Sequence, residues 1–105
     1  MRTPLALALL VAAVAAVPAS GAATRSIAVK DDVFSPKAAT VAKGTTVVWR
    51  WQGDSPHNVV VTSGPVRFKS VVQRSGTFRR RLTRAGTYRY VCTIHAGMRG
   101  TIRVR

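Results

Sequence analysis

The chain carries the sequence YRYVCTIHAGM at residues 88–98, in which an alternating aromatic stretch ends in a thiol, an imidazole and a thioether spaced three residues apart. Cys92 is the only cysteine, Met98 is the only methionine besides the initiator, and His57 is the only histidine outside the segment. One thiolate, two imidazoles and a weak axial thioether form the donor set of blue-copper centres. A structural zinc site is instead completed by a fourth cysteine, histidine or carboxylate. The segment therefore predicts most of a copper site.

The spacing of these side chains also constrains the backbone. Residues three apart on a straight strand are separated by roughly 10 Å, whereas donors bound to one metal ion lie within about 4 Å of each other. The chain must therefore curl after Cys92, and Ala96-Gly97 supplies a small residue and a conformationally free one for that turn. We expect a strand ending at Cys92, a tight loop over Thr93–Met98 and a last strand over Arg99–Arg105.

The same residues resemble a known family. The pattern Tyr-x-Tyr-x-Cys-x-x-His-x-x-Met-x-Gly, with His57-Asn58 upstream, is similar to the small cupredoxins, the plastocyanin-, halocyanin- and amicyanin-like blue copper proteins. The resemblance implies one copper ion per chain, cycling between Cu⁺ and Cu²⁺. It implies that the copper ligands are His57, Cys92, His95 and Met98. It further implies that Asn58 ties the two ligand segments together near the thiolate.

Length and the N-terminal pattern predict one exported domain. Residues 1–22 have the features of a secretory signal peptide: a charged start, an apolar run over 5–17 and small residues at the end. Cleavage after Ala22 or Ala23 fits best, with Ala19 and an uncleaved anchor as alternatives. Residues 23–105 then form a single copper-binding domain, located in the periplasm, outside the cell or on the cell envelope. A lone cysteine in an exported protein needs an explanation. Metal ligation at Cys92 provides one, and a buried inert thiol is the alternative.

The charge balance is strongly basic, with 17 Lys and Arg against 3 Asp and Glu. Such a surface attracts anionic partners and speeds their encounter at low salt. The partner could be an acidic redox protein or an anionic envelope surface, and solvated strand faces would explain the charge equally well. Nucleic-acid binding has no recognisable motif in its favour and needs a different compartment.

Short runs rich in valine, threonine and aromatic residues recur about every ten residues, separated by turn residues. This pattern favours an all-β, antiparallel Greek-key sandwich or barrel with little helix. Successive side chains of a strand alternate between its two faces. One face of the strand over 45–51 should therefore carry Val47, Trp49 and Trp51, and one face of the strand over 87–92 should carry Tyr88, Tyr90 and Cys92. The least regular segment is 66–73, read as an irregular strand with a short helical turn. The expected strands cover residues 26–30, 38–41, 45–51, 57–61, 77–82, 87–92 and 99–105.

Because every strong position of the predicted site is filled, no position is open for a substrate, and we expect a monomeric one-electron carrier rather than an enzyme. By the resemblance, His95 would be the electron exit, with Ala96, Gly97 and Pro56 around it for docking to a redox protein. One alternative is a copper storage or delivery module that uses the same ligands. Another is an enzyme with Cys92 as nucleophile and a histidine base, which leaves Met98 unexplained.

Overall fold

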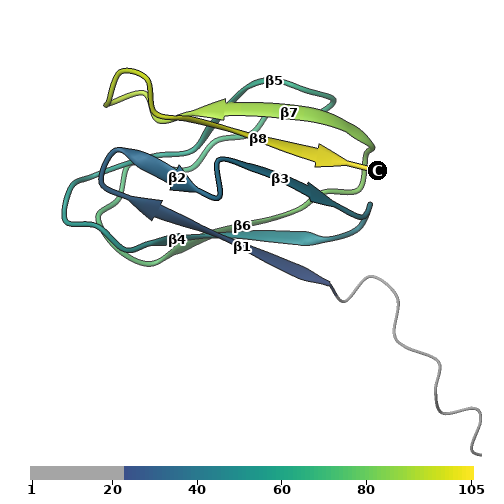
Figure 1. Cartoon of the computed structure of the whole chain (residues 1–105), viewed down its shortest axis with the longest axis horizontal. Helices are drawn as coiled ribbons and strands as arrows, with labels where there is room; N and C mark the ends of the chain where they lie inside the picture. The colour runs from purple at the N-terminus through teal and green to yellow at the C-terminus, as the bar shows by residue number, and fades with distance from the viewer. Residues whose placement is uncertain (1–22) are drawn as a thin grey trace, which may run out of the picture.

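The structure is a computed structural model that describes residues 23–105, so the predicted signal peptide over 1–22 lies outside the described residues. Two four-stranded sheets pack face to face in the order β2-β1-β4-β6 and β3-β8-β7-β5 (Figure 1). The strands are β1 (Thr24–Lys30), β2 (Val33–Ser35), β3 (Ala38–Val41), β4 (Thr46–Trp51), β5 (Val60–Ser63), β6 (Thr77–Arg81), β7 (Gly86–Val91) and β8 (Arg99–Val104). Residues 23–105 contain no helix, and hence none that could cross a membrane.

The predicted all-β sandwich is confirmed, but its sheets are mixed rather than purely antiparallel. β1 pairs with β4 and β3 pairs with β8 in parallel, while the other pairings are antiparallel. Both parallel pairs join strands between which the chain leaves their sheet: it passes through β3 of the other sheet between β1 and β4, and through β4 and β6 of the other sheet between β3 and β8. A strand that returns to its sheet after such a crossover can run in the same direction as the strand it left.

Three segments differ locally from expectation. Val33–Ser35, which is not among the expected strands, forms the short strand β2 against β1. The strand expected from His57 begins only at Val60, and His57 instead makes an isolated antiparallel bridge with Gln73. The segment 66–73 has no strand or helical turn of its own, because its backbone pairs with β5 and His57 only at single points.

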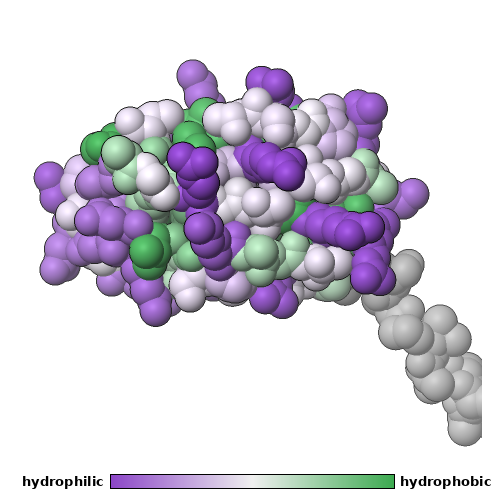
Figure 2. Space-filling view, turned by 45° about the horizontal axis from the view of Figure 1, so that its top comes forward, coloured by the Kyte–Doolittle hydropathy of each residue, from purple (hydrophilic) through white to green (hydrophobic). Residues whose placement is uncertain are grey.

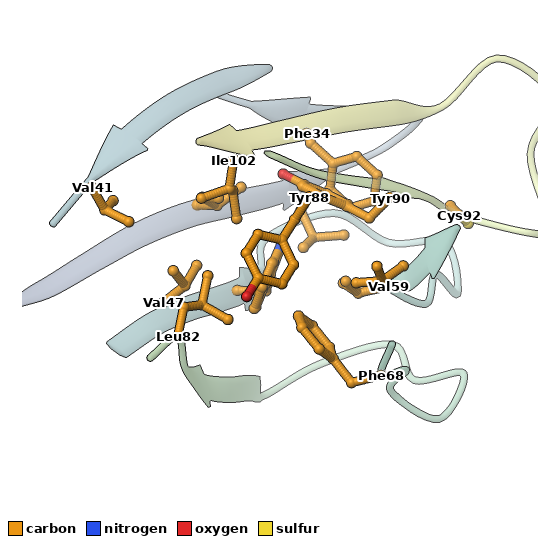
Figure 3. Packing of buried hydrophobic residues seen from close by; sticks show 14 of the residues in the cluster. Phe34, Val41, Val47, Val59, Phe68, Leu82, Tyr88, Tyr90, Cys92 and Ile102 are labelled. Carbon is orange, nitrogen blue, oxygen red and sulfur yellow. The ribbon is translucent and has the colours of Figure 1, made fainter. Parts of the chain in front are cut away.

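The core lies between the sheets and is centred on Trp49, which is fully buried. Its ring meets those of Tyr90 and Phe68 edge-on, at centroid distances of 5.5 and 6.1 Å. Tyr88, Tyr90 and Cys92 all point into this core from the β7 side, as alternation predicted (Figure 3). The inner faces of the two sheets therefore place the Cys92 thiol at one end of a rigid aromatic core.

Strict alternation along β6 puts Arg80 on the same face as Phe78, which is compatible with a bulge or with an edge position. The structure supports the edge position, since β6 is the last strand of its sheet and pairs with β4 without a register shift. The Arg80 guanidinium carbon lies 4.9 Å from the centre of the Phe68 ring. A cation over an aromatic face is favourable, so this contact helps to hold the exposed Arg80 side chain against the open border of the core.

The buried hydroxyl of Tyr90 predicts a loss of stability in alkali. Burial raises the pKa of Tyr90 to about 12 from an ordinary 10.0, and this effect outweighs the lowering by the nearby Trp49 N–H. Neither the Tyr90 hydroxyl nor the Trp49 N–H has a hydrogen-bond partner among residues 23–105. The folded state thus holds this proton more tightly than the unfolded state. The free energy of unfolding should be unaffected below pH 10 and fall by about 2 to 3 kcal/mol as the pH rises to 12.

Urea unfolding of the wild type and of Tyr90→Phe across that pH range measures this effect. Tyr90→Phe should lack the alkaline loss and change little at neutral pH. Tyr88→Phe is the matched control, because the Tyr88 hydroxyl donates to the Arg84 carbonyl at 2.8 Å and its removal leaves Tyr90 intact. An equal alkaline loss in Tyr90→Phe would show that another group is responsible.

Candidate metal centre

The loop from Cys92 to Met98 closes on itself as its spacing predicted. The Cys92 N–H donates to the Met98 carbonyl at 2.9 Å, and the Met98 N–H donates to the His95 carbonyl at 3.3 Å. Gly97 has a φ of 81°, a left-handed conformation that favours glycine, and lies in open space. This turn reverses the chain between β7 and β8 at the end of the molecule opposite the C-terminus (Figure 1).

His57 reaches the same place from a different part of the chain. Its backbone N–H and carbonyl both pair with Gln73 at 3.0 Å, and its carbonyl also accepts the Trp51 indole N–H at 3.2 Å. The side chain is completely buried. These backbone bonds hold the imidazole at the end of the core without a regular strand around it.

The imidazoles of His57 and His95 converge on the Cys92 thiol. The Sγ atom lies 3.8 Å from Nδ1 of His57 and 3.6 Å from Nδ1 of His95. All three donor atoms lie within 4.8 Å of one another. Nitrogen and sulfur donors about 2.0 and 2.3 Å from one ion, at angles near 120°, are separated by roughly 3.7 Å. The spacing therefore fits a single small metal ion in a near-trigonal arrangement.

Met98 and His95 differ in their exposure. Met98 is buried in the same core cluster as Cys92, where a thioether can act as a weak axial donor. The His95 side chain is 26% exposed, whereas His57 is fully enclosed. Of the two imidazoles, only that of His95 would therefore connect a bound metal ion with the protein surface.

Asn58 links the two segments that carry these residues. Its Oδ1 accepts the backbone N–H of Thr93 at 2.9 Å, and its Nδ2 donates to the Thr93 hydroxyl at 2.9 Å. Asn58 is buried. The paired bonds join the residue after His57 to the residue after Cys92, which is the linking position that the resemblance implied for it.

Sequence reasoning missed the two acidic residues at the site. Asp31 and Asp32 form the turn after β1, and Asp32 has a φ of 70°. Yet Asp31 Oδ1 lies 3.0 Å from Nε2 of His57, and Asp32 Oδ1 lies 3.5 Å from Nε2 of His95. The one indication in the sequence was that Asp31 and Asp32 are two of only three acidic residues in the chain.

A β-sandwich with two imidazoles, a thiol and a thioether at one end defines a cupredoxin. The sequence matches the family of copper-binding proteins described as the plastocyanin/azurin family over residues 23–105, and the chain belongs to this family. Copper is accordingly its cofactor, and the donor spacing above fits one ion.

Named relatives are similar over most of the domain. A plastocyanin from Scenedesmus fuscus is 35% identical over 70% of this chain and 87% of its own length. Amicyanin-alpha from Methylorubrum extorquens is 30% identical over 90% of this chain and 83% of its own length.

Solved structures agree with this fold. A variant of amicyanin in the Cu(I) state matches with a TM-score of 0.70 and 27% identity, over 78% of this chain and 82% of its own. A copper-containing nitrite reductase from Thermus scotoductus matches all of this chain with a TM-score of 0.71 and 27% identity, but this chain spans only 28% of it.

Proposed function

We propose that this protein is an exported type 1 copper protein that carries single electrons between redox proteins, with His57, Cys92, His95 and Met98 as the copper ligands. The observation that carries the proposal is the convergence of two Nδ1 atoms on one Sγ at 3.6 and 3.8 Å. A trigonal set of two imidazoles and a thiolate, with a weak thioether, suits both copper oxidation states. Little has to move when the electron arrives or leaves.

The surroundings of the four residues favour electron transfer over substrate turnover. His57, Cys92 and Met98 are buried, so three of the proposed ligands give a substrate no access. The partly exposed His95 is the proposed electron exit. Its sequence neighbour Ile94 is 44% exposed and Val33, beside Asp32, is 51% exposed. Together with Ala96, Gly97 and Pro56 these side chains would form an apolar rim on which a redox partner could dock.

The strongly positive net charge of this chain supports the proposal that its redox partner is acidic. Basic residues outnumber acidic ones 17 to 3, and Figure 2 shows hydrophilic residues spread over much of one face of the molecule. Long-range attraction would speed the encounter of a monomeric carrier with such a partner and weaken as salt is added. The signal-peptide pattern at residues 1–22 supports export to the periplasm or beyond.

Loading the metal-free protein with Cu(II) tests the proposal. We expect one copper ion per chain, an intense blue colour and an EPR spectrum of thiolate-bound Cu(II). A colourless copper complex would contradict the trigonal thiolate site. The rival function, copper storage or delivery, predicts slow electron self-exchange together with ready transfer of copper to an acceptor, so both rates should be measured on the loaded protein.

A further inference from the structure

The three acidic residues of this chain, Asp31, Asp32 and Asp54, are grouped at the proposed copper site. Asp31 and Asp32 form the tip of the β1–β2 hairpin, and each faces the outer nitrogen of a different imidazole. Asp54 lies in the turn before His57, and its backbone N–H bonds to Asp31. The chain has 17 basic residues, so it does not need these three carboxylates for solubility. Their grouping at one site therefore suggests a role in that site.

Asp31 is held in one position by three donors. Its Oδ2 accepts the N–H of Asp54 at 2.9 Å, and its Oδ1 accepts the N–H of Ser55 at 2.9 Å as well as facing His57 Nε2 at 3.0 Å. Hydrogen bonds from two backbone N–H groups favour the ionised form of a carboxyl group. An aspartate side chain is ordinarily deprotonated at neutral pH, so Asp31 is a carboxylate there.

Gly53 is part of this arrangement because a Cβ there would collide with the Asp31 carboxylate. The turn over residues 53–55 thus wraps closely around the Asp31 side chain, with two N–H groups directed at it. A carboxylate that is fixed in this way by the backbone can orient a neighbouring ring rather than be oriented by it.

The contact determines which nitrogen of His57 carries a proton. An ionised carboxylate only accepts hydrogen bonds, so Nε2 of His57 must be the donor. In the neutral ring Nδ1 is then unprotonated, and this is the nitrogen that faces Cys92 Sγ. The ring is therefore already in the tautomer that a metal ion between Nδ1 and Sγ requires.

Resting on the proposed function, we propose that Asp31 is a positioning residue that fixes His57 in its metal-binding tautomer and, through its charge, favours Cu(II) over Cu(I). Asp32 acts in the same sense on His95 but more weakly, because its contact is longer, at 3.5 Å, and its side chain is 66% exposed. The physical reason is that a negative charge behind a ligand stabilises the more positive metal ion.

The chain offers a matched series of variants, Asp31→Asn, Asp32→Asn and Asp54→Asn. Each removes one negative charge at the same end of the molecule and keeps the side-chain shape. Within the described part of the chain, no hydrogen bond or ion pair reaches the Asp54 carboxylate, so Asp54→Asn controls for general electrostatics.

Reduction potentials of the copper-loaded variants test the charge effect. Asp31→Asn should shift the Cu(II)/Cu(I) equilibrium about tenfold toward Cu(I), which is 59 mV upward for a one-electron couple. Asp32→Asn should shift it less, and Asp54→Asn least. Equal shifts in Asp31→Asn and Asp54→Asn would overturn the proposal, because the contact with the ring would then have no influence of its own.

The tautomer is tested without copper. Nitrogen-15 NMR of the metal-free wild type at neutral pH should show the His57 proton on Nε2, and Asp31→Ala should give a mixture of tautomers while circular dichroism verifies the fold. A wild type with the proton on Nδ1 would overturn the proposal. Failure of the blue copper assignment would be recognised separately, from the colour of the loaded wild type.

Discussion

Cys92→Ser should abolish the intense blue colour of the copper-loaded protein. Cys92 is the only thiol in the chain, and its Sγ is the atom on which both imidazoles converge. Serine has nearly the same shape and offers a hard oxygen instead of a soft, readily deprotonated sulfur. The fold should persist, since Cys92 is a small part of a large core, while the short copper–thiolate bond that defines blue sites is lost.

The measurement is the visible absorption and EPR spectrum of copper-loaded wild type and variant at equal copper content. Met98→Leu is the matched control. It removes a sulfur from the same loop but leaves two imidazoles and the thiolate, so the blue colour should remain while the reduction potential changes. Persistence of the blue colour in Cys92→Ser would exclude the thiolate as its source.

Asn58→Ala should be the most destabilising of the substitutions considered near the site. It removes both bonds to Thr93 and leaves the Thr93 N–H without the partner it has in the structure. Two lost hydrogen bonds in a largely buried position cost about 2 to 4 kcal/mol of unfolding free energy. Copper should also bind less tightly, because the His57 and Cys92 segments are no longer tied together.

Urea unfolding of the metal-free protein measures this loss. Thr93→Val, which removes only the hydroxyl end of the link, should cost about 1 kcal/mol. The double variant Asn58→Ala/Thr93→Val should lose less unfolding free energy than the two single variants together, because both single variants break the same bond from Asn58 Nδ2 to the Thr93 hydroxyl. Strict additivity would mean that Asn58 and Thr93 do not act together.

Much of the local structure was predictable from the sequence. Alternation placed Trp49 and Tyr90 in the core, because successive side chains of a strand point to opposite faces whatever its neighbours are. The spacing of Cys92, His95 and Met98 predicted a curled loop, because residues three apart can share one ion only if the backbone turns between them. The resemblance added His57 and Asn58.

The sequence alone therefore determined which residues face inward and where the loop after Cys92 turns, since these depend on neighbours along the chain, and its few histidine, cysteine and methionine residues limited the possible copper donors. Only the tertiary structure decided that β1 and β4 run parallel, that Nδ1 of His57 comes within 3.8 Å of a sulfur 35 residues away, and that Asp31 faces the other side of that imidazole. The reason is physical: such contacts depend on how separate strands are packed in space, and no local preference of the chain specifies them.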